Sequence, residues 1–193
     1  SALMGWVDWL KNHPDKTEEI IPEMEADLQR LEQIGRRFSK MGSKSDFEEL
    51  DLSERVEKIV NYLTKRLPSI GKKVKLVNDI QPGIFIRANG SLLAWSIENI
   101  IRNGIDAIER EDGMISISLK KDVDGIKIRI EDNGKGIPKK DWKNIFRPGF
   151  STKQTGWGLG LSLSSRIVEE IHGGSLKVIS SSFDTGTIIE ISL

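Results

Sequence analysis

Apolar and polar positions follow two different patterns along this chain, and the change between them predicts two segments. In the first segment, apolar side chains recur every seven positions at Met24, Leu31 and Phe38. That repeat predicts a helix over about residues 17–41 that packs against other helices. Residues 1–12 are also rich in apolar side chains and predict the end of an earlier helix. Together the two helices predict a helical hairpin.

A short polar stretch, Ser43–Asp46, separates this hairpin from the rest of the chain. We place a domain boundary there, because polar residues between two periodic segments are typical of a connection. The predicted domains are therefore residues 1–43 and residues 44–193.

Beyond the boundary, short alternating segments predict strands and longer amphipathic segments predict helices. Strands are predicted over residues 47–52, 73–80, 83–87, 113–121, 125–131, 175–181 and 187–192, and helices over residues 53–67, 91–110 and 158–171. Ser53, with Glu57 close behind it, is predicted to begin the first of these helices. Because most strands follow one another through hairpin connections, the predicted fold class is α+β, a two-layer α/β sandwich, rather than a parallel Rossmann sheet.

The charge balance and the cysteine content exclude several classes of function. Basic and acidic residues number 29 each, so no net field favours nucleic acid or an anionic membrane surface. We expect no nucleic-acid partner and no direct membrane contact, and an anionic ligand must be held by local groups. The absence of cysteine excludes disulfides, thiolate metal sites and thiol catalysis.

The apolar segments are too short to cross a membrane. No uninterrupted run approaches the roughly 20 residues that a bilayer requires. The opening SALMGWVDWL lacks the basic start of a signal peptide. We expect the chain to be soluble and cytoplasmic. Because it begins with Ser1 rather than methionine, we also expect a fragment of a longer protein, whose membrane anchor could lie elsewhere.

Two glycine-rich stretches lie close together, DNGKGIP at residues 132–138 and GWGLGLSL at residues 156–163. Neither contains the lysine and threonine that end a P-loop. Glycine lets the backbone approach a ligand closely and adopt positive φ, so the pair suggests one bound molecule held at two places. Two tight turns in a β-rich domain remain the alternative for each loop alone.

Asn99 and Asn103 stand four residues apart, so they lie on one face of the predicted helix. A buried amide without a partner costs about 1 to 3 kcal/mol, so a polar group is expected opposite them. Oxygen ligation of a hard cation such as Mg²⁺ is the functional interpretation, since that ion prefers oxygen donors and keeps waters while bound to phosphates. Amides that cap nearby backbone are the alternative.

Asp132 opens the first glycine loop, where its carboxylate can accept a hydrogen bond from an exocyclic amine and so select adenine. The second loop opens a helix, where unsatisfied backbone amides favour anions. Gly156, Gly158 and Gly160 would admit phosphates close to that backbone. Lys153 is either a cation that reaches a terminal phosphate or a solvated surface lysine.

Taken together, the two asparagines, DNGKGIP, Phe146 with Phe150, and GWGLGL resemble in order and spacing the N, G1, F and G2 boxes of the GHKL superfamily. The resemblance is specifically to the catalytic domain of sensor histidine kinases, covers about residues 44–193, and implies that the bound molecules are ATP and Mg²⁺. It implies catalytic roles for Asn99 and Asn103, with Asn103 on the metal, and a mobile lid between the glycine boxes. The nucleotide-binding residues that it implies are Asp132, Gly134, Gly136, Phe146, Lys153, Gly156, Gly158, Leu159 and Gly160. Gly104 and Trp157 depart from the family pattern, in which alanine and a small polar residue are more usual.

The hairpin over residues 1–43 resembles the tail of the family's dimerisation and histidine-phosphotransfer domain, without the phosphoacceptor box. This implies a homodimer in the full-length protein and a response regulator receiver domain as partner. Neither His13, which precedes Pro14, nor His172, in EIHGG, matches the phosphoacceptor pattern. We therefore expect a chain that holds ATP and does not phosphorylate itself.

Related ATPases such as gyrase, and the anti-sigma serine kinases, resemble one another in a glutamate four residues before the metal-binding asparagine. Asn99 occupies that position here, and an amide cannot act as a general base. Glu98 lies about 100° round the helix from it. A conformational ATPase that uses Glu98 or another acid, and a nucleotide-binding module without catalysis, remain the alternatives.

Overall fold

A computed structural model describes residues 47–70, 73–151, 158–183 and 185–193, together with isolated residues among the first 46. Those isolated residues are helical. The rest of the predicted hairpin, including His13, lies outside the described residues, as do Lys153, Gly156 and Trp157. Residues 47–150 and 158–193 belong to one compact unit.

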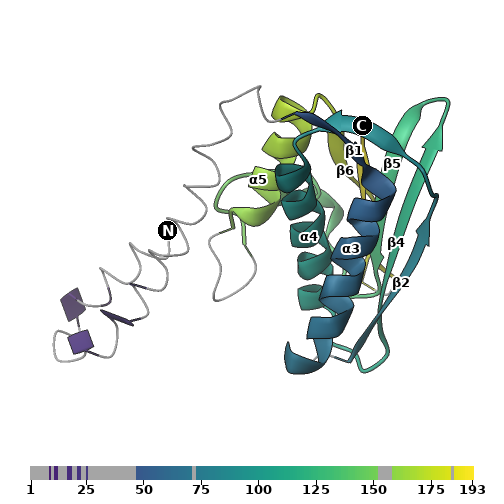
Figure 1. Ribbon diagram of the computed structural model, residues 1–193. Coiled ribbons are helices and arrows are strands. Elements are labelled where there is room, and N and C mark those ends of the chain that lie inside the picture. The colour runs from purple at the N-terminus through teal and green to yellow at the C-terminus, as the bar shows by residue number, and fades with distance from the viewer. Residues whose placement is uncertain are drawn as a thin grey trace. The chain divides into compact units, whose positions relative to one another are not determined.

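This unit contains strands and helices in nearly the predicted order. The elements are β1 (Glu48–Asp51), α3 (Leu52–Arg66), η4 (Leu67–Ile70), β2 (Val74–Ile80), β3 (Phe85–Ala88), α4 (Gly90–Ala107), β4 (Gly113–Asp122), β5 (Gly125–Asp132), η5 (Lys139–Asp141), η6 (Asn144–Phe146), α5 (Gly160–Arg166), η7 (Ile167–Ile171), β6 (Ser175–Ser182) and β7 (Gly186–Ser192). Five strands form one sheet in the order β2-β4-β5-β7-β6, and β1 pairs with β3 separately. Only the β2–β4 pair is parallel within the five-stranded sheet. The helices α3 and α4 cover one face of this sheet, which confirms the predicted two-layer α+β sandwich (Figure 1).

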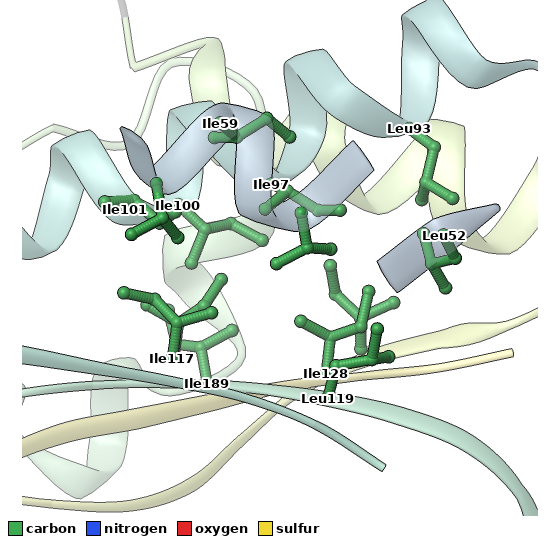
Figure 2. Packing of buried hydrophobic residues seen from close by; sticks show 14 of the residues in the cluster. Leu52, Ile59, Leu93, Ile97, Ile100, Ile101, Ile117, Leu119, Ile128 and Ile189 are labelled. Carbon is green, nitrogen blue, oxygen red and sulfur yellow. The ribbon is translucent and has the colours of Figure 1, made fainter. Parts of the chain in front are cut away.

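The core lies between the helix layer and the sheet and consists almost entirely of aliphatic side chains. Ile97, Ile100 and Ile101 of α4 point toward Ile117 and Ile128 of the sheet (Figure 2). The strict alternation that predicted β4 places every second residue in this core, since a strand turns successive side chains to opposite faces. Each large aliphatic side chain that is fully buried contributes about 1.5 to 3 kcal/mol.

The prediction that Ser53 begins α3 was wrong. The helix is capped by Asp51, whose side chain accepts a hydrogen bond from the Glu54 backbone N–H at 3.0 Å. Ser53 is buried, donates to the carbonyl of Gln81 at 2.7 Å and accepts from the Ile84 N–H at 3.0 Å. Its hydroxyl therefore satisfies backbone groups of the β2–β3 connection, which lies far away in the sequence.

Two other helix boundaries also differ from prediction. Helix α4 ends at Ala107 rather than Arg110, because Ile108 leaves the helix in an extended conformation and is buried. Helix α5 begins at Gly160 rather than Gly158, since the φ of +61° at Gly158 is incompatible with a right-handed helix. It continues as the π-helical turn η7 to Ile171, as far as the sequence predicted.

Candidate functional site

The side chain of Asn99, a residue of α4, lies against α5. Its side-chain nitrogen donates to the Ser164 hydroxyl at 3.0 Å, and that hydroxyl is buried. A methyl group added at Gly160 would lie 2.6 Å from the Asn99 side-chain oxygen and 3.0 Å from its nitrogen. A side chain at position 160 would therefore collide with the Asn99 amide unless that amide moved. The structure thus brings together Asn99 and Gly160, which the sequence singled out. Ser164 is a third residue of this cluster, and the sequence did not reveal it.

Asn103 follows one helical turn after Asn99 and is half-buried. Its neighbour Gly104 packs tightly against the sheet, since an added methyl group would lie 2.8 Å from the Ile115 side chain and 3.5 Å from a carboxylate oxygen of Asp132. This close packing brings the part of α4 that carries Asn103 to the end of β5. The glycine that departs from the family pattern thus lies beside the predicted adenine-binding residue.

Asp132 is the last residue of β5, and only 6% of its surface is exposed. Burial raises the pKa of Asp132 to about 6, and hydrogen bonds from the backbone N–H groups of Gly134 and Thr187 oppose that rise without cancelling it. The Gly134 bond measures 2.9 Å. No side-chain cation of the described residues contributes to this pKa. Burying the charged form of this carboxylate lowers the stability of the protein without a ligand, and the same carboxylate is well suited to accept a hydrogen bond from a ligand.

The first glycine loop is held on one side by the end of α4. The Lys135 N–H donates to the Ala107 carbonyl at 3.0 Å, so the residue that ends the helix also binds the loop. A methyl group at Gly134 would lie 2.6 Å from that same carbonyl oxygen. Glycine at position 134 therefore allows two backbone segments to approach each other closely.

The other side of the loop is held by the end of β6 and by Trp142. Gly136 has a φ of +72°, and a methyl group there would lie 2.1 Å from the Ser182 carbonyl oxygen. The Ile137 N–H donates to the Ser181 hydroxyl at 2.7 Å, and the Trp142 ring N–H donates to the Ile137 carbonyl at 3.0 Å. The loop is thus fixed by hydrogen bonds that need no ligand.

Thr187 is a site residue that the sequence interpretation missed. It stands opposite Asp132 in the β5–β7 register and is 3% exposed. Gly186, just before it, has a φ of +86°, and a methyl group there would lie 1.8 Å from the Asp132 carbonyl oxygen. The available signal was the Gly-Thr pair that opens the last strand, ahead of Ile188 and Ile189.

The second glycine segment is described only from Gly158 onward. A methyl group at Gly158 would lie 2.6 Å from the backbone of both Gly149 and Phe150, and the Gly149 N–H donates to the Gly158 carbonyl at 3.0 Å. Leu159 precedes α5, and its carbonyl accepts from the Leu163 N–H at 3.0 Å. Gly149 and Gly158 are therefore held together by a backbone hydrogen bond.

Phe146, in η6, packs against the hydrophobic core while partly exposed. Phe150 is half-buried and precedes the second glycine segment by six residues. Both rings therefore belong to the connection that joins the two glycine loops.

His172 has a structural role away from these residues. Its Nε2 accepts from the Asn89 backbone N–H at 3.2 Å, so the proton must be on Nδ1, which lies 2.7 Å from the Ile167 carbonyl oxygen. The ring also lies 5.1 Å from the ring of Phe47. Both nitrogens are engaged, and neither is presented to a nucleotide.

Comparison with known proteins agrees with this geometry. Residues 89–193 match the family described as histidine kinase-, DNA gyrase B-, and HSP90-like ATPase. Sporulation kinase B of Bacillus subtilis is 29% identical over 170 residues, which are 87% of this chain and 39% of that protein. Sensor histidine kinase ZraS of Escherichia coli K12 is 40% identical over 103 residues, which are 53% of this chain and 21% of that protein. The chain thus spans well under half the length of these relatives.

Solved structures share the fold. The catalytic domain of histidine kinase ThkA superimposes with a TM-score of 0.67 at 22% identity, covering 76% of this chain and 94% of that one. The structure of histidine kinase ThkA in complex with response regulator protein TrrA gives a TM-score of 0.69 at 21% identity, covering 100% of this chain and 56% of that one. Among the described residues, no helix is long and apolar enough to cross a membrane.

Proposed function

The chain belongs to the family of histidine kinase-, DNA gyrase B- and HSP90-like ATPases, and we propose that it is the ATP-binding catalytic part of a sensor histidine kinase. In this proposal the γ-phosphate of ATP passes to a histidine and from there to an aspartate of a response regulator. The observation that carries the proposal is the buried carboxylate of Asp132, which lies beside glycines that admit no side chain.

Asp132 would bind the adenine base. Its carboxylate receives hydrogen bonds from two backbone N–H groups and can accept a further one. The exocyclic amine of adenine is a suitable donor, whereas guanine carries a carbonyl oxygen at the corresponding position, which a carboxylate would repel. The first glycine loop, fixed by Ala107 and Ser181, would form the rigid wall beside the base.

Asn103 would contribute an amide oxygen to Mg²⁺, and the nucleotide phosphates and water would supply the other ligands. The described residues contain no group of three or more His, Cys, Asp or Glu side chains that could hold a metal ion. An ion bound mainly through phosphates and water needs no such cluster, so the residues fit Mg²⁺ in this role. The ion would neutralise charge on the phosphates during transfer. Lys153 and the glycines at positions 156, 158 and 160 would lie along the phosphates.

The reaction that the site favours is transfer to a histidine rather than hydrolysis. Glu98, the acid beside Asn99 on α4, forms an ion pair with Arg102 at 2.7 Å. The Asn99 side chain is an amide and is hydrogen-bonded to Ser164. The Asn99 amide therefore cannot remove a proton from water, and the Glu98 carboxylate lies about 100° round α4 from it. An imidazole acceptor is itself a nucleophile and needs no such base on α4.

The acceptor histidine would come from another part of the parent protein. His172 is engaged at both ring nitrogens. Residues 1–43 would be the partial dimerisation and phosphotransfer hairpin, residues 44–193 the catalytic domain, and the parent a homodimer whose partner is a receiver domain. A parent anchored in the membrane, with this part in the cytoplasm, is consistent with these roles.

Equilibrium binding of ATP and GTP to the wild-type chain and to Asp132→Asn tests the proposal. The variant loses a charge-assisted hydrogen bond of about 1.5 to 3 kcal/mol, so ATP affinity should fall roughly ten- to a hundredfold. Asp124→Asn is the matched control, because the Asp124 side chain is 76% exposed in the β4–β5 turn. Equal ATP affinity in Asp132→Asn and wild type would remove the adenine assignment.

A further inference from the structure

The end of β6 and the start of β7, which belong to neither glycine loop, contact the first loop and the end of β5 at several points. Ser182 lies against Gly136 and Gly186 lies against the end of β5, each so closely that a side chain is excluded. Between these two contacts, the hydroxyl of Ser181 accepts from the Ile137 N–H at 2.7 Å. The two partners are separated by 44 residues in the sequence.

The Ser181 hydroxyl is also linked to the strand that faces Asp132. Its oxygen lies 3.1 Å from the Gly186 carbonyl oxygen and 2.9 Å from the hydroxyl of Thr187. A serine hydroxyl has one proton and two lone pairs, so it can accept from Ile137 and still bond toward the 186–187 segment. The backbone of Thr187 in turn donates to the Asp132 carboxylate. One hydroxyl thus connects the loop to the strand that supports the carboxylate.

We propose that Ser181 is a positioning residue for the adenine end of the nucleotide site: it fixes the first glycine loop at Ile137 and holds Thr187 beside Asp132. This inference rests on the proposed function. Ser181 touches no reacting atom in this account, and acts by keeping the loop and the carboxylate at a fixed separation. Its effect therefore concerns the base and not the phosphates.

Loss of the hydroxyl has a definite consequence. In Ser181→Ala the Ile137 N–H loses its acceptor, and the loop gains freedom relative to β7. One neutral hydrogen bond corresponds to about a twofold to tenfold change in an equilibrium constant. We expect adenosine and ATP to lose affinity by the same factor within that range. The loss should be equal in Mg²⁺ and in chelator, because the change lies away from the phosphates.

The neighbouring residue Ser180 offers a matched control. It lies on the same strand, is exposed, and pairs with Ile188 through its backbone. Ser180→Ala removes the same atom and should bind adenosine and ATP as the wild type does. Calorimetric titration of the three proteins with adenosine, ATP and ATP plus Mg²⁺, together with their melting temperatures, makes the comparison.

The outcomes separate the two proposals. If the wild type binds neither adenosine nor ATP, the proposed function itself fails. If the wild type binds both and folded Ser181→Ala binds adenosine equally well, the positioning role alone is overturned. A loss seen only for ATP with Mg²⁺ also overturns it, because that result places the effect at the phosphates.

A second measurement needs no variant, in case Ser181→Ala does not fold. Hydrogen exchange in the wild-type protein should show the Ile137 amide protected before any nucleotide is added, since it already has a partner. Exchange of Ile137 as fast as that of the exposed turn residue Val123, which is fully solvent-accessible, would contradict the proposal.

Discussion

The side-chain amide of Asn99 donates to the hydroxyl of Ser164 across 3.0 Å and at the same time covers Gly160, one turn earlier on α5. This amide therefore bridges α4 and α5 at the point where the second glycine segment enters its helix. The predicted catalytic role of Asn99 remains a proposal, and its contact with Ser164 gives it a structural role that can be tested separately.

Gly160→Ala should destabilise the wild type and be tolerated when Asn99 is removed. The added methyl group would lie 2.6 Å from the Asn99 oxygen, and overpacking of this kind costs about 1 to 3 kcal/mol. In an Asn99→Ala background that collision is absent, and alanine is favoured over glycine in a helix by up to about 1 kcal/mol. Urea unfolding of the wild type, the two single variants and the double variant measures the four stabilities that this comparison needs. A similar cost for Gly160→Ala in both backgrounds would show that Asn99 is not the obstacle.

Gly136→Ala and Gly83→Ala form a matched pair, because their φ angles are +72° and +71°. Alanine in this left-handed region costs about 1 to 2 kcal/mol at either position. At Gly136 the methyl group would also lie 2.1 Å from a backbone oxygen, whereas nothing lies within 4 Å at Gly83. We expect Gly136→Ala to be less stable than Gly83→Ala by about 1 to 3 kcal/mol. We also expect Gly136→Ala to lose ATP binding. Equal stabilities would contradict the packing of the loop against the end of β6.

The stability of the free protein should depend on pH through Asp132. Burial raises its pKa to about 6 from 3.8, so between these values the folded state holds a proton that the unfolded state has released. The contribution of Asp132 to the free energy of unfolding is therefore greatest at low pH and falls as the pH rises through about 4 to 6. Relative to Asp132→Asn, the wild type should lose on the order of 2 to 3 kcal/mol between about pH 4 and pH 7. A stability difference that stays constant with pH would show that Asp132 is not desolvated as described.

Much of the fold could be predicted from the sequence because its elements are locally specified. The alternation of Gly113–Lys121 leaves one buried face, and the turn before Gly125 joins it to the next strand, so both strands and their hairpin followed from neighbouring residues. The positions of Asp132 and the first glycine loop followed in the same way, since the loop directly continues β5.

The remaining features depend on residues that are distant in sequence. The sequence predicts that Ser53 caps a helix. In the structure its hydroxyl instead bonds to the carbonyl of Gln81 and the N–H of Ile84, which are distant in the sequence. Ser181 carries no local signal, because its partner Ile137 is 44 residues away. The parallel pairing of β2 with β4 likewise joins strands that are separated in the sequence by β3 and α4, and no hairpin pattern reveals it.

Asn103→Ala should weaken ATP binding mainly when Mg²⁺ is present. An amide that ligates the ion loses an oxygen donor in the variant, whereas ATP in chelator does not use that donor. Titration of wild type and variant with ATP, in Mg²⁺ and in chelator, should show a larger affinity ratio in Mg²⁺. If the ratio is the same in both conditions, the metal role of Asn103 is wrong.

In the proposed function, the chain holds ATP for transfer to a histidine that it does not itself supply. The most direct test is to incubate the purified chain with γ-labelled Mg-ATP for about an hour and to follow the label, alone and with a separate histidine-bearing dimerisation hairpin. We predict that the label stays in ATP when the chain is alone, since Glu98 is paired with Arg102 and both nitrogens of His172 are engaged, and moves to the added hairpin when it is present. Steady release of free phosphate from the chain alone would contradict the account, because it would require a base that activates water.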